Sequence, residues 1–180
     1  VIQYSENWEY GGNFDGQGFI NAEVSKATRA GILWVNAAGN YAGQVYDGPI
    51  PEEALRFTNR FDENRVRITV AWNDFRDVEN HQTELDLDAE VWDDVGHVVA
   101  RGDREQVVVP DHPRSEHTLH AREIFTATLD RGEYRIHLTR MAGVFKLAHR
   151  VRVWITTERP ETGVAFTDHT PEREVMIPAD

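Results

Sequence analysis

The sequence predicts a mainly β protein, in which an antiparallel β-sandwich is inserted into a partial α/β segment. Three observations support this fold class. From about residue 55 to residue 157, apolar and polar residues alternate, as they do in strands with one buried and one exposed face. The first 43 residues show the strand, helix, strand spacing of one βαβ crossover. Between them, residues 44–53 contain Gly48, Pro49 and Pro51, which interrupt both patterns and indicate a boundary.

The α/β segment is predicted from local patterns. Residues 1–5 form a short apolar start, and a loop with four glycines follows. Residues 19–30 place Ile20, Val24 and Ala27 at helical spacing, and Gly31 stands where a helix favours a left-handed residue after its last turn. Residues 32–35 are an unbroken apolar run, typical of a strand that is covered on both faces of a parallel sheet.

The sandwich is predicted from about eight short strands, separated by turns rich in Asp, Asn and Gly. The clearest alternating segments are residues 66–72, 85–91, 125–129, 134–138 and 151–155. The last stretch contains three prolines and is predicted to be a return linker with one short strand near residues 174–177. The expected division of the chain is therefore residues 1–43 for the α/β segment, 44–159 for the sandwich and 160–180 for the return segment.

Composition excludes several classes of function. The formal net charge of −12 argues against nucleic acid or an anionic membrane as partner, since both require a cationic face. No apolar run approaches the length of a membrane span. The absence of cysteine excludes disulfide scaffolds, thiolate zinc sites and cysteine nucleophiles. Residue 1 is Val and no leader precedes it, which indicates either a removed leader or a piece of a longer chain.

One segment of the α/β region carries a family resemblance. Residues 31–40 read Gly-Ile-Leu-Trp-Val-Asn-Ala-Ala-Gly-Asn and follow the predicted helix. This block resembles the oxyanion segment of the subtilisin-like serine proteases. Upstream, residues 1–5 resemble the family strand that binds the substrate backbone, although Glu6 and Asn7 stand where the family has Leu-Gly.

The far end of the chain resembles the same family. Residues 177–180 resemble the short Pro-Ala segment that usually follows the oxyanion loop closely, but here 137 residues separate Asn40 from Pro178. The resemblance therefore implies a domain inserted into a protease loop. Within that insert, residues 85–92 and 129–136 are similar to the pre-peptidase C-terminal and jelly-roll domains that accompany secreted proteases. We therefore expect the sandwich to be jelly-roll-like.

The resemblance implies a role for four residues. Asn40 would donate its side-chain amide to the charge that develops on the carbonyl oxygen of the substrate, and Ser5, Ala38 and Gly39 would contact the substrate. The alternative for Asn40 is a turn residue in a left-handed conformation. No serine lies in the family's Gly-Thr-Ser context and no histidine precedes Gly-Thr, so the triad is expected outside this chain; the three serines are Ser5, Ser25 and Ser115.

The implied function is part of a secreted or periplasmic subtilisin-like endopeptidase that is not active alone. Its partners would be the remainder of the catalytic domain and, through the whole protease, a polypeptide substrate. Two alternatives come from other classes. A surplus of Trp and Tyr suits a stand-alone sandwich that binds carbohydrate or protein, and a purely structural insert would brace the protease or gate its cleft.

Acidic residues cluster just before and within one predicted strand. Asp74, Asp77, Asp86 and Asp88 could supply the hard oxygens that calcium requires, so calcium is the first candidate cofactor. The alternative is a solvated sheet face, neutralised by Arg65 or Arg67 on a neighbouring strand. A zinc site is the weaker metal hypothesis, since it would rest on histidines in a Pro-rich loop without defined spacing: His112, His117 and His120.

Overall fold

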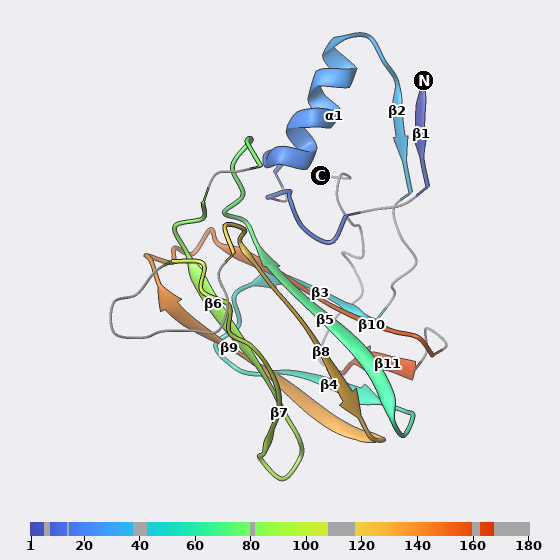
Figure 1. Cartoon of the computed structure of the whole chain (residues 1–180), viewed down its shortest axis with the longest axis vertical. Helices are drawn as coiled ribbons and strands as arrows, with labels where there is room; N and C mark the ends of the chain where they lie inside the picture. Colours follow the sequence, from blue (N-terminus) through green and yellow to red (C-terminus); the bar gives the residue numbers. More distant parts are fainter. Residues whose placement is uncertain are drawn as a thin grey trace.

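The computed structural model describes residues 1–5, 8–13, 15–37, 43–79, 82–107, 118–159 and 163–167. The protein is mainly β: one helix and a two-stranded parallel sheet accompany two antiparallel sheets (Figure 1). This confirms the predicted fold class. Within the described ranges, no helix is long and apolar enough to cross a membrane.

The α/β segment contains β1 (Ile2–Tyr4), α1 (Phe19–Arg29) and β2 (Trp34–Asn36). The helix begins directly after Gly18 and is followed by Gly31, whose φ of 77° is the left-handed geometry predicted there. Strands β1 and β2 pair in parallel, with Ile2 opposite Trp34. The segment therefore has the predicted strand, helix, strand order.

The parallel pair is exposed, which differs from the cover on both faces that the apolar run predicted. The side chains of Val1, Leu33 and Val35 are 89%, 60% and 47% exposed. Parallel sheets normally have both faces covered, because their crossover helices lie on them. In the described part of the chain this sheet has two strands and only α1 as a helix, so its apolar surface remains in solvent.

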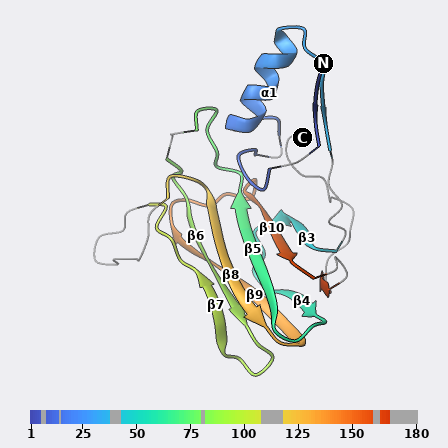
Figure 2. The same ribbon diagram turned by 45° about the vertical axis from the view of Figure 1, so that its right-hand side comes forward.

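The first sheet of the sandwich has the order β3-β10-β5-β8, and its neighbours all pair antiparallel. Its strands are β3 (Val45–Pro49), β10 (Arg150–Thr157), β5 (Asn64–Trp72) and β8 (Arg122–Leu129). Strand β5 points toward the end of the sandwich at which α1 lies (Figure 2). The residues that follow β5 can therefore reach the α/β segment.

The second sheet has the order β11-β4-β9-β6-β7 and is also antiparallel. Its strands are β11 (Val164–Phe166), β4 (Leu55–Asn59), β9 (Gly132–Ala142), β6 (Asp86–Trp92) and β7 (Val98–Gly102). Strand β11 lies in the stretch expected to be a return linker, and it extends this sheet beyond the expected boundary at residue 159. The strand predicted near residues 174–177 falls outside the described residues.

The core lies between the two sheets and is built from one face of each strand. On β5, Val66, Ile68 and Val70 are fully buried, and on β6 Leu87 and Val91 are fully buried. Alternation along the sequence predicted these inward positions. Burying a large apolar side chain stabilises a fold by about 1.5–3 kcal/mol, so this interface supplies most of the driving force for folding.

The chain enters and leaves the sandwich at one point. The amide of Phe166, at the end of β11, donates to the carbonyl of Gly43, two residues before β3, at 2.7 Å. The amide of Ile155 on β10 donates to the carbonyl of Gln44 at 3.0 Å. The two residues just before β3 are therefore hydrogen-bonded to β11 and β10, the last two described strands of the sandwich. Nearby termini are the geometry that tolerates insertion into another domain.

Candidate functional site

The chain on either side of the predicted oxyanion turn can be placed only in part. Ala38, Gly39 and Asn40 lie outside the described residues, so their predicted roles stay predictions. The described chain reaches Ala37, whose amide donates to the carbonyl of Tyr4 at 3.0 Å. The predicted substrate-binding residue Ser5 follows Tyr4 and is exposed. The approach to the turn thus runs beside the end of β1.

Three aromatic rings lie around that end of the parallel pair. Tyr4 and Trp8 stack with ring centroids 4.5 Å apart and an interplanar angle of 3°, and Trp34 lies 6.3 Å from Tyr4 and 6.5 Å from Trp8. All three side chains are half-buried. The stack joins Tyr4, which precedes Ser5, to Trp8, three residues after it, and stacked rings add to the energy of burial.

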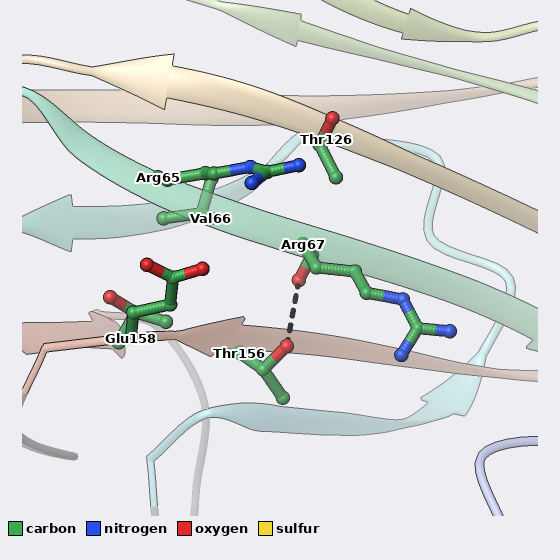
Figure 3. Close-up of a pocket in the computed structure, with 7 residues that line it drawn as sticks. Arg65, Val66, Arg67, Thr126, Thr156 and Glu158 are labelled. Atoms are coloured by element: carbon green, nitrogen blue, oxygen red, sulfur yellow. Dashed lines mark hydrogen bonds between the residues drawn. The ribbon is translucent and has the colours of Figure 1, made fainter.

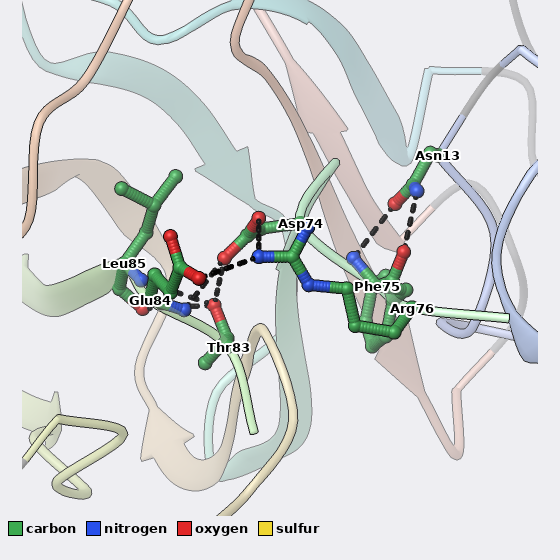
Figure 4. Close-up of polar contacts among 7 residues, drawn as sticks. All are labelled: Asn13, Asp74, Phe75, Arg76, Thr83, Glu84 and Leu85. Atoms are coloured by element: carbon green, nitrogen blue, oxygen red, sulfur yellow. Dashed lines mark hydrogen bonds and ion pairs between the residues drawn. The ribbon is translucent and has the colours of Figure 1, made fainter. Parts of the chain in front are cut away.

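The loop between β1 and α1 is held by the sandwich. Glu9 accepts from Arg67 Nη1 at 2.6 Å and from Thr69 Oγ1 at 2.7 Å, with one carboxylate oxygen for each. Asn13 makes two hydrogen bonds with the backbone of Phe75, one as donor at 2.6 Å and one as acceptor at 2.8 Å (Figure 4). These partners lie about 60 residues apart in the sequence, so local patterns do not reveal them.

An aromatic cluster completes this junction. The rings of Tyr10, Phe19, Phe75 and His120 lie with centroids 5.5–6.5 Å apart. The guanidinium of Arg122 lies 3.8 Å from the centroid of Tyr10. Burial, followed by the positive charge of Arg122, lowers the pKa of His120. This shift favours the neutral form of the ring, and the zinc role weighed for His120 gains no further ligand among the described residues.

Two of the carboxylates predicted to bind calcium are used in hydrogen bonds within the fold. Asp74 accepts from Thr83 Oγ1 at 2.5 Å and from the amide of Glu84 at 2.8 Å (Figure 4). Asp77 accepts from the amide of Gly18 at 3.0 Å, directly before α1. A carboxylate at the start of a helix interacts favourably with the helix dipole. Asp77 thus fixes where the helix begins.

The other two acidic residues lie on β6, and the predicted solvated face is wrong for one of them. Asp86 is fully buried and accepts from the amide of Val107 at 3.3 Å, whereas Asp88 is half-buried. Neutralisation by Arg65 or Arg67 on a neighbouring strand is also wrong, because β5 and β6 belong to different sheets. Alternation correctly predicted that Leu87, Ala89 and Val91 are buried, but it revealed neither the burial of Asp86 nor the strands beside β6.

Among the residues that the structure describes, no group of three or more His, Asp or Glu side chains is arranged to hold a metal ion. Asp74 and Asp77 point to different partners, and Asp86 and Asp88 lie on another element. Calcium binding by these four residues stays a prediction.

A melting experiment tests calcium binding directly. Bound calcium should raise the melting temperature in proportion to the logarithm of its concentration above Kd, because only the folded state binds it. We expect a higher melting temperature in millimolar calcium than in excess chelator, and Asp86→Asn should reduce the difference. Equal melting temperatures in both solutions would exclude the site.

A groove of about 300 Å³ lies on the outer face of the first sheet (Figure 3). Strand β5 contributes Arg65 and Arg67, and the remaining polar lining residues are Thr126, Thr156, Thr157 and Glu158. The predicted pairing of Arg67 with an acidic residue is confirmed, but the partner is Glu9 rather than a residue of β6. Among the described residues, no aromatic side chain lines this groove, so they provide no stacking platform of the kind expected at a carbohydrate site.

The aromatic residues that motivated the binding-module alternative are mostly used in packing. Trp72 and Trp154 are buried, and Trp92 is half-buried with its ring 5.1 Å from that of His137. Trp34 and Trp8 belong to the stack beside Ser5. The aromatic surplus therefore has a structural explanation at each of the five tryptophans.

One buried acid was missed by the sequence analysis. Glu123 on β8 is fully buried, and burial raises its pKa to about 8, although hydrogen bonds from Gln106 and from the backbone of Arg104 act in the opposite direction. Its Oε2 has no hydrogen-bond partner among the described residues. The sequence does carry a signal for this burial, because Glu123 alternates in step with Ala127 and Leu129, which point into the core from β8. Glu123 is therefore a protonated acid at neutral pH.

Comparisons with known proteins show a likeness of fold. No protein-family profile and no curated protein that was compared matches the sequence. Among solved structures, the chain is similar to the CspB protease of Clostridium perfringens, with a TM-score of 0.54 and 13% identity over 99% of this chain and 39% of that one. At this identity the likeness shows a shared fold alone, and the chain spans about two fifths of the length of that protease.

Proposed function

We propose that this chain is part of a subtilisin-like serine endopeptidase, and that it supplies the oxyanion donor Asn40 and one wall of the substrate cleft. Its sandwich is an accessory, jelly-roll-like domain inserted after the oxyanion turn. The proposal rests on the Ala-Ala-Gly-Asn block of residues 37–40, read in its context of helix, glycine and strand. The similarity in fold to a protease of Clostridium perfringens supports it.

One structural observation carries the proposal furthest: β1 and β2 form an exposed parallel pair. Leu33 and Val35 remain in solvent on a sheet type that is normally covered on both faces. Further strands and helices of a host domain would cover them. The single crossing point at Gly43 and Phe166 supports the same interpretation, since a host loop can be interrupted there without displacing its two ends.

The chemistry assigned to Asn40 is electrostatic. During acyl transfer, negative charge develops on the carbonyl oxygen of the substrate, and a fixed amide donor binds that oxygen better than it binds the ground state. Ser5, at the end of β1, and residues 38–39 would hold the substrate backbone beside it. The nucleophile, base and orienting acid would come from the remainder of the catalytic domain, so this chain would not cleave peptides alone.

The setting follows from the same proposal. A polypeptide would be the substrate of the whole protease, and the remainder of the catalytic domain would be the partner of the exposed sheet. Subtilisin-like endopeptidases with such accessory domains are secreted or periplasmic, and we propose that location for the parent protein.

Substitution of Asn40 tests the proposal. In the whole protease, Asn40→Ala should lower kcat by a factor of about 100 or more while KM changes little, because the donor acts mainly in the transition state. Asn36→Ala, on the strand just before the turn, is the control for a merely local disturbance. The 180-residue chain alone should show no labelling by a fluorophosphonate probe. An unchanged kcat in Asn40→Ala, or labelling of Ser5, Ser25 or Ser115, would contradict the proposal.

A further inference from the structure

The described part of the loop that joins β1 to α1 is hydrogen-bonded to the sandwich at three places. Glu9 binds β5, Asn13 binds the backbone of Phe75 after β5, and the amide of Gly18 donates to Asp77. These three anchors extend from Glu9 to Gly18, the residue directly before the helix. The conformation of the loop between these two residues therefore depends on the sandwich.

The anchor at Glu9 is the one nearest to the predicted substrate strand. Glu9 follows Ser5 by four residues and its side chain is 17% exposed, whereas that of Arg67 is 45% exposed. Each carboxylate oxygen has its own donor, Arg67 Nη1 or Thr69 Oγ1. Two directional bonds to one carboxylate fix its orientation as well as its position, which one ion pair on the surface would not do.

The neighbours of Glu9 in the loop transmit this constraint toward the end of β1. Trp8 stacks on Tyr4, which precedes Ser5, and Tyr10 lies under the guanidinium of Arg122 from β8. Glu9 thus stands between one ring that packs on the parallel pair and one that packs on the sandwich. A displacement of Glu9 would move both rings and, with them, the residues that flank Ser5.

We infer that Arg67 and Thr69 of the sandwich are positioning residues for the substrate cleft, acting through Glu9 on the loop that follows Ser5. The inference rests on the proposed function, and it gives the inserted domain a part in substrate binding. It predicts that loss of the Glu9 anchor loosens residues 8–13 and weakens substrate binding more than the chemical step.

Hydrogen exchange on the 180-residue chain tests the structural half of the inference. Arg67→Ala should speed exchange of amides in residues 8–13 by about fivefold, the size expected for loss of a half-exposed charged bond. Thr69→Val removes only the hydroxyl and should act in the same direction. Arg65→Ala is the matched control, since Arg65 lies on the same face of β5 but the ion pair to Glu9 is made by Arg67. Melting curves establish that each variant is folded.

Kinetics of the whole protease test the functional half. Arg67→Ala and Thr69→Val should each raise KM about fivefold and change kcat less than twofold, while Arg65→Ala changes neither. Arg67→Glu should raise KM more than Arg67→Ala does. The double variant Arg67→Glu, Glu9→Arg should recover part of the lost substrate binding. A general loss of stability would not be reversed in this way. Unchanged exchange or an unchanged KM in Arg67→Ala would overturn the inference while leaving the proposed function intact. A parent protein without peptidase activity would refute the proposed function and this inference together.

Discussion

Between pH 4.5 and 8 the ionisation of Glu123 should lower the free energy of unfolding as the pH rises. The folded state holds the proton of this buried acid up to a pKa of about 8, whereas the unfolded chain releases it near 4.5. The folded state therefore binds more protons over this interval, so unfolding becomes easier as pH increases. The contribution of Glu123 is on the order of 4–5 kcal/mol; it is fully present below pH 4.5 and is lost above about pH 8.

The measurement compares wild type with Glu123→Gln by chemical denaturation at pH 5 and at pH 8.5. The amide cannot ionise, so the variant should be about as stable as wild type at pH 5 and several kcal/mol more stable at pH 8.5. Taking the difference between the two proteins cancels the opposite contributions of His120 and His149, whose pKa values are lowered mainly by burial. The exposed Glu158→Gln is the control. If the two curves remain parallel over this pH range, Glu123 does not hold its proton.

Asn59→Leu should destabilise the sandwich by about 3–5 kcal/mol, because it leaves several buried polar groups without partners. Asn59 is fully buried, and its amide donates to the carbonyls of Phe61, Leu129 and Asp130 at 2.8, 3.1 and 2.7 Å. Its oxygen accepts from the side chain of Asn64 at 2.8 Å. One side chain thus joins β4, β5 and the turn between β8 and β9.

Two variants calibrate this prediction. Thr157→Val removes the outermost bond of the network, from Thr157 Oγ1 to Asn64 Oδ1 at 2.5 Å, together with an exposed bond from the amide of Arg159 at 3.1 Å, and should cost about 1 kcal/mol. Thr58→Val lies next to Asn59 but loses an exposed bond to Glu133, so it should change stability by less than about 0.5 kcal/mol. Urea denaturation measures all three. If Asn59→Leu lowers the free energy of unfolding no more than Thr157→Val does, water must be binding the buried groups that Asn59 no longer reaches.

Local periodicity was sufficient to predict the elements but not their neighbours. The helix after Gly18 and strands such as β5 and β10 were predictable, because burial of one face imposes a repeat that the sequence must carry. The assignment of β5 and β6 to different sheets was not, since alternation specifies a face and leaves the adjacent strand open. For this reason the sequence misassigned the partner of Arg67 and the exposure of Asp86.

In the candidate site, too, local patterns could be predicted from the sequence and long-range contacts could not. The segment around Asn40 was identified by its residue pattern alone, and its geometry lies outside the described residues. The contact between Glu9 and Arg67 joins residues 58 apart, so only the tertiary fold reveals it. Glu123 was accessible in principle, because an acid on the apolar register of a strand is a local signal that needs no knowledge of the neighbouring strands.

The bond between Phe166 and Gly43 has a consequence for genetic engineering. A segment whose ends meet at the spacing of two paired strands, about 4.8 Å, can be removed or transplanted as a cassette without a long spacer. A deletion that joins residue 43 to residue 167 through one or two glycines should remove the sandwich with little displacement of the two residues that are joined. The same geometry would favour transfer of this segment by recombination. An unrelated protein could accept it at a loop whose two ends are about as far apart as two paired strands.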